Sequence, residues 1–100
     1  MGSTTVKQLY DQAVRSFQNK NYAGALLLLT CAEAMPEWDK VGLRSRGSLV
    51  YVRARCLYSL GWLDNALACC TLLKKTYQDP RGAALAKRIL GTGHDNEQAA

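Results

Sequence analysis

The sequence contains an internal similarity between residues 9–29 and residues 50–70. In each half an alanine stands one helical turn before an aromatic residue, and an Ala-Leu pair follows after a short turn. The matched pairs are Leu9 and Val50, Tyr10 and Tyr51, Ala13 and Ala54, Phe17 and Tyr58, Tyr22 and Leu63, Ala25 and Ala66, Leu26 and Leu67, and Leu29 and Cys70. Helices that cross closely need small side chains where they touch. The similarity therefore predicts two copies of one unit, each made of two packed helices.

The first half carries start and stop signals for two helices. Thr5 and Gln8 have the spacing of a capping box, in which each side chain bonds the backbone N–H of the other residue. We expect this helix to end near Asn19, because asparagine tolerates the left-handed conformation that follows many helices. Asn21 can cap the second helix, and Pro36 should end it because a proline disfavours the α conformation in the residue before it.

The second half repeats this arrangement. Ser48 can cap a third helix that extends to Leu60, and Gly61 follows at the position where a glycine commonly ends a helix. The fourth helix is expected from Leu63 to about Tyr77, with Asp64 available as a cap near its start. Residues 37–47, between the two halves, are expected to form a connector with at most part of a helical turn.

Asp79 and Pro80 form a strong start signal for a fifth helix, since Asp is a favoured cap and Pro a favoured first helical residue. This helix is expected to end at Gly91, and the small polar residues 92–100 are expected to form a disordered tail. No segment shows the alternation of apolar and polar residues that is typical of a strand. The sequence therefore predicts an all-α fold of about five helices.

Length and charge limit the function classes. One hundred residues suit a single domain, and a hydrophobic content of 48% favours a folded chain. The net charge of +5 favours acidic partners, but the basic residues are scattered, so no nucleic-acid binding is expected. No apolar run is long enough for a membrane span, and no secretory signal peptide is visible. We therefore expect a soluble, cytoplasmic protein.

The cysteines do not have the spacing of a metal site or a disulfide framework. All four fall within apolar helical patterns, at Cys31, Cys56, Cys69 and Cys70, and the chain lacks a C-x-x-C motif. The one histidine, His94, lies in the predicted tail, and no glycine-rich phosphate loop or Ser-His-Asp order is present. We expect no metal, no cofactor and no enzyme activity. A soft-metal or redox role of Cys69 and Cys70 is the alternative, although buried cysteines more often act as small hydrophobic residues.

The segments "QNKNYAGALLLLTCAEAMP" and "YSLGWLDNALACCTLLKKTYQDP" resemble tetratricopeptide repeats (TPRs), whose helix pairs carry a small residue, an aromatic, a turn, an alanine and a terminal proline. The resemblance covers about residues 5–90. The positions that carry the structural pattern are Ala13, Tyr22, Ala25, Ala54, Gly61, Ala66 and Pro80. The resemblance implies a right-handed superhelix of two helix hairpins with a C-terminal capping helix.

The implied organisation follows the chain in order. It comprises a disordered N-terminus at 1–4, a first TPR-like repeat at 5–36, a connector at 37–47, a second repeat at 48–79, a capping helix at 80–91 and a disordered tail at 92–100. Three or more repeats are usual for stability. Two repeats with a cap therefore favour a partner that completes the core, or self-association.

The family binds partners on the concave face of the superhelix, which is formed by the first helix of each pair. Carried over to this chain, the groove positions would be Lys7, Tyr10, Val14, Phe17, Tyr51, Arg55 and Tyr58. Aromatic and basic side chains together suit a peptide or amphipathic helix that has apolar anchors and acidic character. The alternative for Phe17 and Tyr58 is packing against the second helix of their own repeats.

This pattern predicts a protein-binding module that acts as an adaptor, scaffold or chaperone. A narrower resemblance, to the larger chaperone of the type III secretion needle subunit, rests on residues 56–61, on Ala66 with Leu67, and on residues 78–81. That resemblance implies a chaperone that prevents premature polymerisation of the needle protein. A self-associating assembly module is a further alternative.

Overall fold

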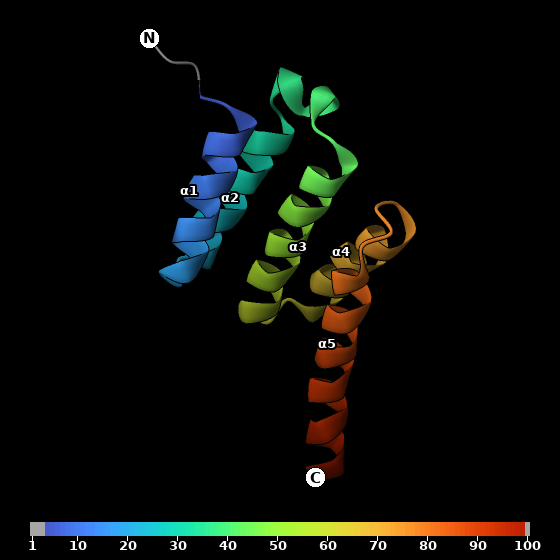
Figure 1. The fold of residues 1–100 in the computed structure, drawn as a ribbon. Coiled ribbons are helices and arrows are strands. Elements are labelled where there is room, and N and C mark those ends of the chain that lie inside the picture. Colours follow the sequence, from blue (N-terminus) through green and yellow to red (C-terminus); the bar gives the residue numbers. More distant parts are fainter. Residues whose placement is uncertain (1–3, 100) are drawn as a thin grey trace.

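The computed structural model describes the backbone of residues 4–99 and the side chains of residues 4–91. This part of the chain folds into five α-helices and one short 3₁₀ helix, with no strand (Figure 1). The elements are α1 (Val6–Gln18), α2 (Tyr22–Glu33), η1 (Pro36–Lys40), α3 (Leu43–Ser59), α4 (Leu63–Lys75) and α5 (Pro80–Ala99). The predicted all-α class is confirmed.

The first hairpin begins and turns at the predicted cap residues. The Gln8 amide donates to Thr5 Oγ1 over 3.1 Å, and the Thr5 amide donates to Gln8 Oε1 over 2.9 Å, which completes the capping box. Asn21 Oδ1 caps α2 by accepting from the Gly24 amide over 3.1 Å. The left-handed residue of the turn is Lys20, with φ of 66°, and not Asn19, whose φ is −85°.

The connector is shorter than predicted, because α3 begins at Leu43 and not at Ser48. The Arg46 guanidinium donates to the Trp38 carbonyl oxygen over 2.8 Å and lies 5.1 Å from the centre of the Trp38 ring. These contacts join the first turn of α3 to η1. Since η1 ends at Lys40 and α3 begins at Leu43, the predicted connector at 37–47 is mostly helical. Ser48 lies inside the helix, where its hydroxyl accepts a hydrogen bond from Arg81 and does not cap α3.

The second hairpin turns at Gly61, whose φ of 83° is the left-handed conformation that favours glycine. The helix α4 begins at Leu63 as predicted, but the residue at its cap position is Trp62, and Asp64 lies in the first turn. The carboxylate of Asp64 is therefore placed to interact with the positive end of the helix dipole without capping it. The helix ends at Lys75, before the predicted end at Tyr77.

The fifth helix begins at the predicted signal. The Asp79 Oδ1 atom accepts a hydrogen bond from the Arg81 amide over 3.0 Å, and Pro80 is the first helical residue. The helix continues past Gly91, where the sequence predicted its end. The predicted tail at 92–100 lies outside the residues whose side chains are described, as does most of the predicted disordered segment at 1–4.

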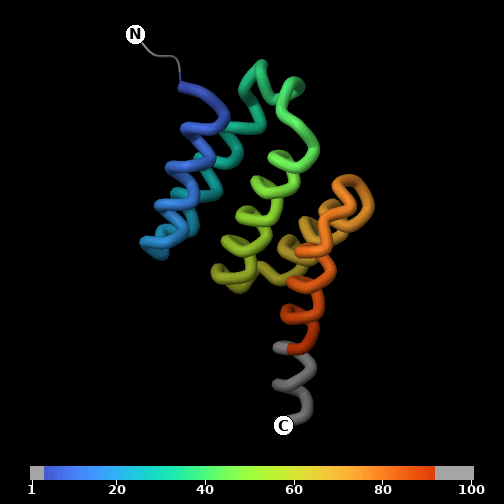
Figure 2. Tube along the Cα trace, in the orientation of Figure 1, coloured from blue at the N-terminus to red at the C-terminus, as the bar shows by residue number. Residues whose placement is uncertain are grey.

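The helices pack as two hairpins followed by a fifth helix. In Figures 1 and 2, α1 lies along α2, and α3 lies between this first pair and the α4–α5 pair. The helix α3 contacts α1 and α2 of the first pair and also α4 and α5. Ala13 and Ala25 in the first pair, like Ala54 and Ala66 in the second, are each 0% exposed. The matched small residues of the two halves therefore occupy equivalent, fully buried positions.

The apolar side chains form two core clusters that share α3. The first comprises Val6, Leu9, Ala13, Ala25, Leu29, Ala32, Leu49 and Cys56, and the second comprises Ala54, Leu57, Ala66, Cys70, Leu85 and Ile89. The half-buried Leu26 of α2 packs against both clusters. Because α3 contributes to each cluster, the packing of one hairpin depends on the same helix as the packing of the other.

Candidate functional site

Arginine and aromatic side chains from α1, α3 and α5 meet on one face of the molecule. The Arg55 guanidinium carbon lies 5.0 Å from the centre of the Phe17 ring and 5.8 Å from that of Tyr51. The Arg81 guanidinium carbon lies 4.7 Å from the centre of the Tyr51 ring. These distances are within the range of cation–π attraction. We call Phe17, Tyr51, Arg55, Arg81 and the nearby Tyr10 the arginine–aromatic face.

Arg81 is held on this face by its neighbours. Its Nη2 atom donates to Asp79 Oδ2 over 2.7 Å and to Ser48 Oγ over 3.1 Å, and its Nε atom donates to Asp79 Oδ1 over 3.1 Å. The hydrogen bond from Arg81 lowers the pKa of the Asp79 carboxyl, and the same bond raises the pKa of Arg81. Asp79 thus both caps α5 and orients the guanidinium over Tyr51.

Arg55 is held differently. The ion pairs among the described residues join Arg53 to Glu33 and Arg81 to Asp79, and none of them involves Arg55. The Arg55 guanidinium lies between rings of α1 and α3, which fix its position without neutralising its charge. A guanidinium is weakly hydrated and presents a planar fork of donors that matches a carboxylate. The arrangement can therefore accept an acidic group from outside the chain.

A cavity of about 490 Å³ opens beside this face, between α1, η1 and the start of α3. Its walls include Lys7, Tyr10, Trp38, Val41 and Leu49. Burial raises the pKa of the Tyr10 hydroxyl, and the nearby positive charge of Arg81 acts in the opposite direction. The wall also carries Asp11, whose negative charge opposes that of a ligand carboxylate. The cavity itself therefore suits an apolar side chain, and Arg55, which does not line it, is the group that suits an acidic one.

The sequence-predicted groove residues fall into three groups. Phe17, Tyr51 and Arg55 come together on the arginine–aromatic face, whereas Lys7 and Tyr10 line the adjoining cavity. The remaining two, Val14 and Tyr58, are half-buried.

Two of the predicted groove residues, Phe17 and Tyr58, also pack against apolar side chains. The ring of Phe17 lies 5.6 Å from that of Tyr22 in α2, so it packs against the second helix of its own hairpin while also contacting Arg55. The half-buried ring of Tyr58 packs against the second core cluster. The packing interpretation of Phe17 therefore applies, and its role in partner binding stays a prediction.

Sequence reasoning missed Arg81 and Trp38 as members of this region. Arg81 was placed only in the predicted capping helix at 80–91, and the position of Trp38 depends on η1, which the sequence did not predict as a full element. The Asp-Pro-Arg spacing was the available signal, since an arginine two residues after a capping aspartate can return to its carboxylate.

The buried thiols are poorly suited to nucleophilic or metal chemistry. Burial raises the pKa of the thiols of Cys69 and Cys70, and it raises the pKa of the Cys56 thiol to about 11. The thiolate is the reactive and metal-binding form, so burial disfavours both roles. Among the residues that the structure describes, no group of three or more His, Cys, Asp or Glu side chains is placed to hold a metal ion. The side chain of His94 lies outside that part.

Comparisons with protein-family models, with curated proteins and with solved structures found no match for this chain. The resemblance to tetratricopeptide repeats therefore stays a prediction from the sequence. In the described part of the chain, none of the helices combines the length and the apolar character that crossing a bilayer requires.

Proposed function

We propose that this chain is a TPR-like protein-interaction module that holds a peptide or amphipathic helix of a partner protein on its arginine–aromatic face. The observation that carries the proposal is Arg55, a guanidinium fixed between two aromatic rings with no carboxylate partner among the described residues. Arginine and tyrosine are enriched among the residues that dominate protein interfaces.

The chemistry of the face favours a ligand with both acidic and apolar side chains. A carboxylate can form a charge-assisted, two-point hydrogen bond with Arg55. An apolar side chain next to that carboxylate can enter the cavity between Tyr10 and Trp38. The net charge of +5 favours the approach of an acidic partner from a distance. An adaptor, a scaffold and a chaperone would all use such a face.

The test compares the wild type with Arg55→Glu and with Arg15→Glu, a matched charge reversal at an exposed position of α1. Each protein is immobilised, exposed to an extract of its native source, and the retained proteins are identified by mass spectrometry. The retained partner is then purified and titrated against all three proteins by calorimetry. We expect Arg55→Glu to weaken binding at least ~10-fold, as loss of an interface arginine typically does, whereas Arg15→Glu binds as the wild type does.

Circular dichroism of the variants checks that their helical content is unchanged. A partner that binds Arg55→Glu and the wild type with equal affinity would show that the binding surface is elsewhere.

A further inference from the structure

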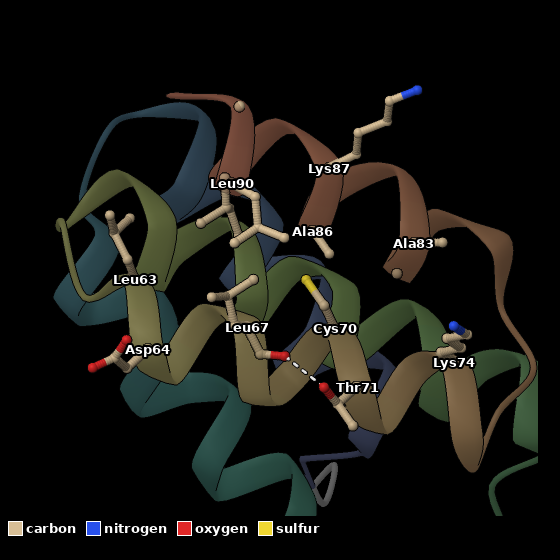
Figure 3. A pocket seen from close by; sticks show the side chains of 13 residues that line it. Leu63, Asp64, Leu67, Cys70, Thr71, Lys74, Ala83, Ala86, Lys87 and Leu90 are labelled. Carbon is tan, nitrogen blue, oxygen red and sulfur yellow. Dashed lines mark hydrogen bonds between the residues drawn. The ribbon is translucent and has the colours of Figure 1, made fainter. Parts of the chain in front are cut away.

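An open groove runs between α4 and α5, away from the arginine–aromatic face. Leu63 and Leu67 of α4 form one wall, and Ala86 and Leu90 of α5 form the other (Figure 3). Leu90 is 60% exposed and lies in the lining of this groove, and exposed apolar side chains that adjoin one another often mark an interaction site. The groove shares no residue with the arginine–aromatic face or with the cavity beside it.

The packing of α5 explains why this surface is apolar. Leu85 and Ile89 belong to the second core cluster, and the half-buried Ala86 packs against it. Ile89 and Ala86 also line the groove, so the groove lies directly over this cluster, with the exposed Leu90 beside them. The helix approaches α4 closely at Gly82, where an added Cβ would lie 2.7 Å from Leu73 Cβ and 2.8 Å from the Cys70 carbonyl oxygen. The close approach holds the two walls at a fixed spacing.

The dimensions of the groove suit a helix better than a small molecule. Its volume of about 1120 Å³ exceeds the roughly 300–1,000 Å³ of ordinary small-molecule sites. The α4 wall from Leu63 to Lys74 rises about 16 Å at the standard rise per residue, which equals about three helical turns. Helix-in-groove recognition uses apolar anchors over two to three turns in this way.

The charges along the groove indicate the chemistry of the occupant. Lys74 lies at one end, Asp64 lies at the other, and Lys87 projects from the α5 wall (Figure 3). We propose that this groove docks an amphipathic helix of a partner protein, with an apolar stripe on the groove floor and carboxylates opposite Lys74 and Lys87. The net charge of +5 disfavours a second copy of this chain at the same place, because like charges repel.

The test uses two synthetic helical peptides of about four turns, each with leucines at i, i+3, i+4 and i+7. One peptide carries glutamates beside the leucines, and the other carries lysines at the same positions. Binding to the full chain is measured by fluorescence anisotropy at low and high salt. We expect the acidic peptide to bind at least ~10-fold more tightly than the basic one at low salt, with the difference shrinking as salt screens the charges.

Variants of the groove test the contacts one at a time. Leu90→Glu should weaken binding of the acidic peptide at least ~10-fold, because it places a carboxylate in the apolar contact. The control for this change is Leu27→Glu, which alters a residue 66% exposed on α2. Lys74→Glu should weaken binding of the acidic peptide ~3- to 10-fold. Lys75 is exposed but does not line the groove, so Lys75→Glu should leave binding unchanged.

Three results would overturn the proposal. The first is equal binding of the acidic and basic peptides, or no binding of either. The second is acidic-peptide binding that survives Leu90→Glu but disappears in Arg55→Glu, since the peptide would then occupy the arginine–aromatic face. The third is a dimer in sedimentation velocity that Leu90→Glu dissociates, because a second copy would then fill the groove. Arg55→Glu should bind this peptide as the wild type does, because Arg55 does not line the groove. The function proposed for the arginine–aromatic face is tested separately, with the partner retained from the extract.

Discussion

Arg55 and Arg81 show how two residues of one type, in contact with the same ring, are used differently. Both guanidinium groups lie near Tyr51, but Arg81 is committed to Asp79 and Ser48 by hydrogen bonds. Arg55 contacts two rings and has no ion pair among the described residues, so its charge remains available. Arg81 therefore has a mainly structural role at the start of α5, and Arg55 is the better candidate for recognition of a carboxylate.

Cys56 gives a pH-dependent prediction at the residue scale. Its fully buried thiol has a pKa of about 11, above the ordinary value of 9.0, because burial disfavours the thiolate. Between these two values the unfolded chain releases the proton while the folded chain keeps it, so the free energy of unfolding falls as pH rises. This thiol should account for a loss of at most about 2–3 kcal/mol between pH 9 and 11.

Urea denaturation of the wild type and Cys56→Ala at pH 8 and pH 11 measures this contribution. The alanine variant lacks the thiol, so the stability difference between the two proteins should narrow at the higher pH. The thiols of Cys69 and Cys70 and the hydroxyl of Tyr10 are present in both proteins, so their titration cancels in the difference. Parallel losses of stability would mean that the Cys56 thiol ionises as readily in the folded chain as in the unfolded chain.

At the scale of the helices, local signals predicted some boundaries and tertiary contacts determined others. Thr5, Asn21 and Asp79 cap their helices as predicted, because a cap depends on residues only two or three positions away. The predicted start of α3 was wrong because the contacts of Arg46 with Trp38 extend the helix toward η1. No pattern within the α3 segment encodes that contact.

The same distinction applies to the candidate site. The resemblance to TPRs supplied the predicted groove positions, and three of them, Phe17, Tyr51 and Arg55, do meet. The contribution of Arg81 depends on how α5 stacks against α3, which only the packed structure reveals. The α4–α5 groove was missed for a similar reason, since it exists only between two helices.

Gly82 gives a prediction at the scale of helix pairs. The higher helix propensity of alanine should stabilise the helix by about 1 kcal/mol in Gly82→Ala. The added methyl group would, however, overlap the Cys70 carbonyl oxygen, which lies in the α4 backbone. Overpacking of this kind costs about 1–3 kcal/mol, and a helix backbone cannot yield as a flexible side chain can. We therefore expect a net decrease in the free energy of unfolding.

The control is Gly91→Ala in the same helix, where the described part of the chain places no atom from another element within 4 Å of the added methyl group. This variant should be as stable as the wild type or more stable by up to about 1 kcal/mol. Urea denaturation of both variants makes the comparison. If Gly82→Ala is as stabilising as Gly91→Ala, α5 does not approach α4 as closely as the structure indicates.

At the scale of the whole molecule, α3 makes the two hairpins one cooperative unit. It supplies Leu49 and Cys56 to the first core cluster and Ala54 and Leu57 to the second. In stacked helical repeats, stability is the sum of the stability of each unit and of the interfaces between neighbours. A helix shared between two clusters makes the interface term large, so neither hairpin should unfold alone.

The two tryptophans allow this coupling to be measured. Trp38 lies in η1 beside the first cluster, and Trp62 precedes α4 and is 55% exposed. The variant Trp62→Phe leaves Trp38 as the reporter for the first hairpin, and Trp38→Phe leaves Trp62 as the reporter for the second.

Leu29→Ala, which opens a cavity in the first cluster, should lower the free energy of unfolding by about 2–5 kcal/mol. Because α3 is shared, the urea midpoint reported by Trp62 should fall together with that reported by Trp38. Leu27→Ala, at an exposed position of the same helix, should leave both midpoints unchanged. A midpoint for Trp62 that stays constant in Leu29→Ala would show that the second hairpin is stable without the first.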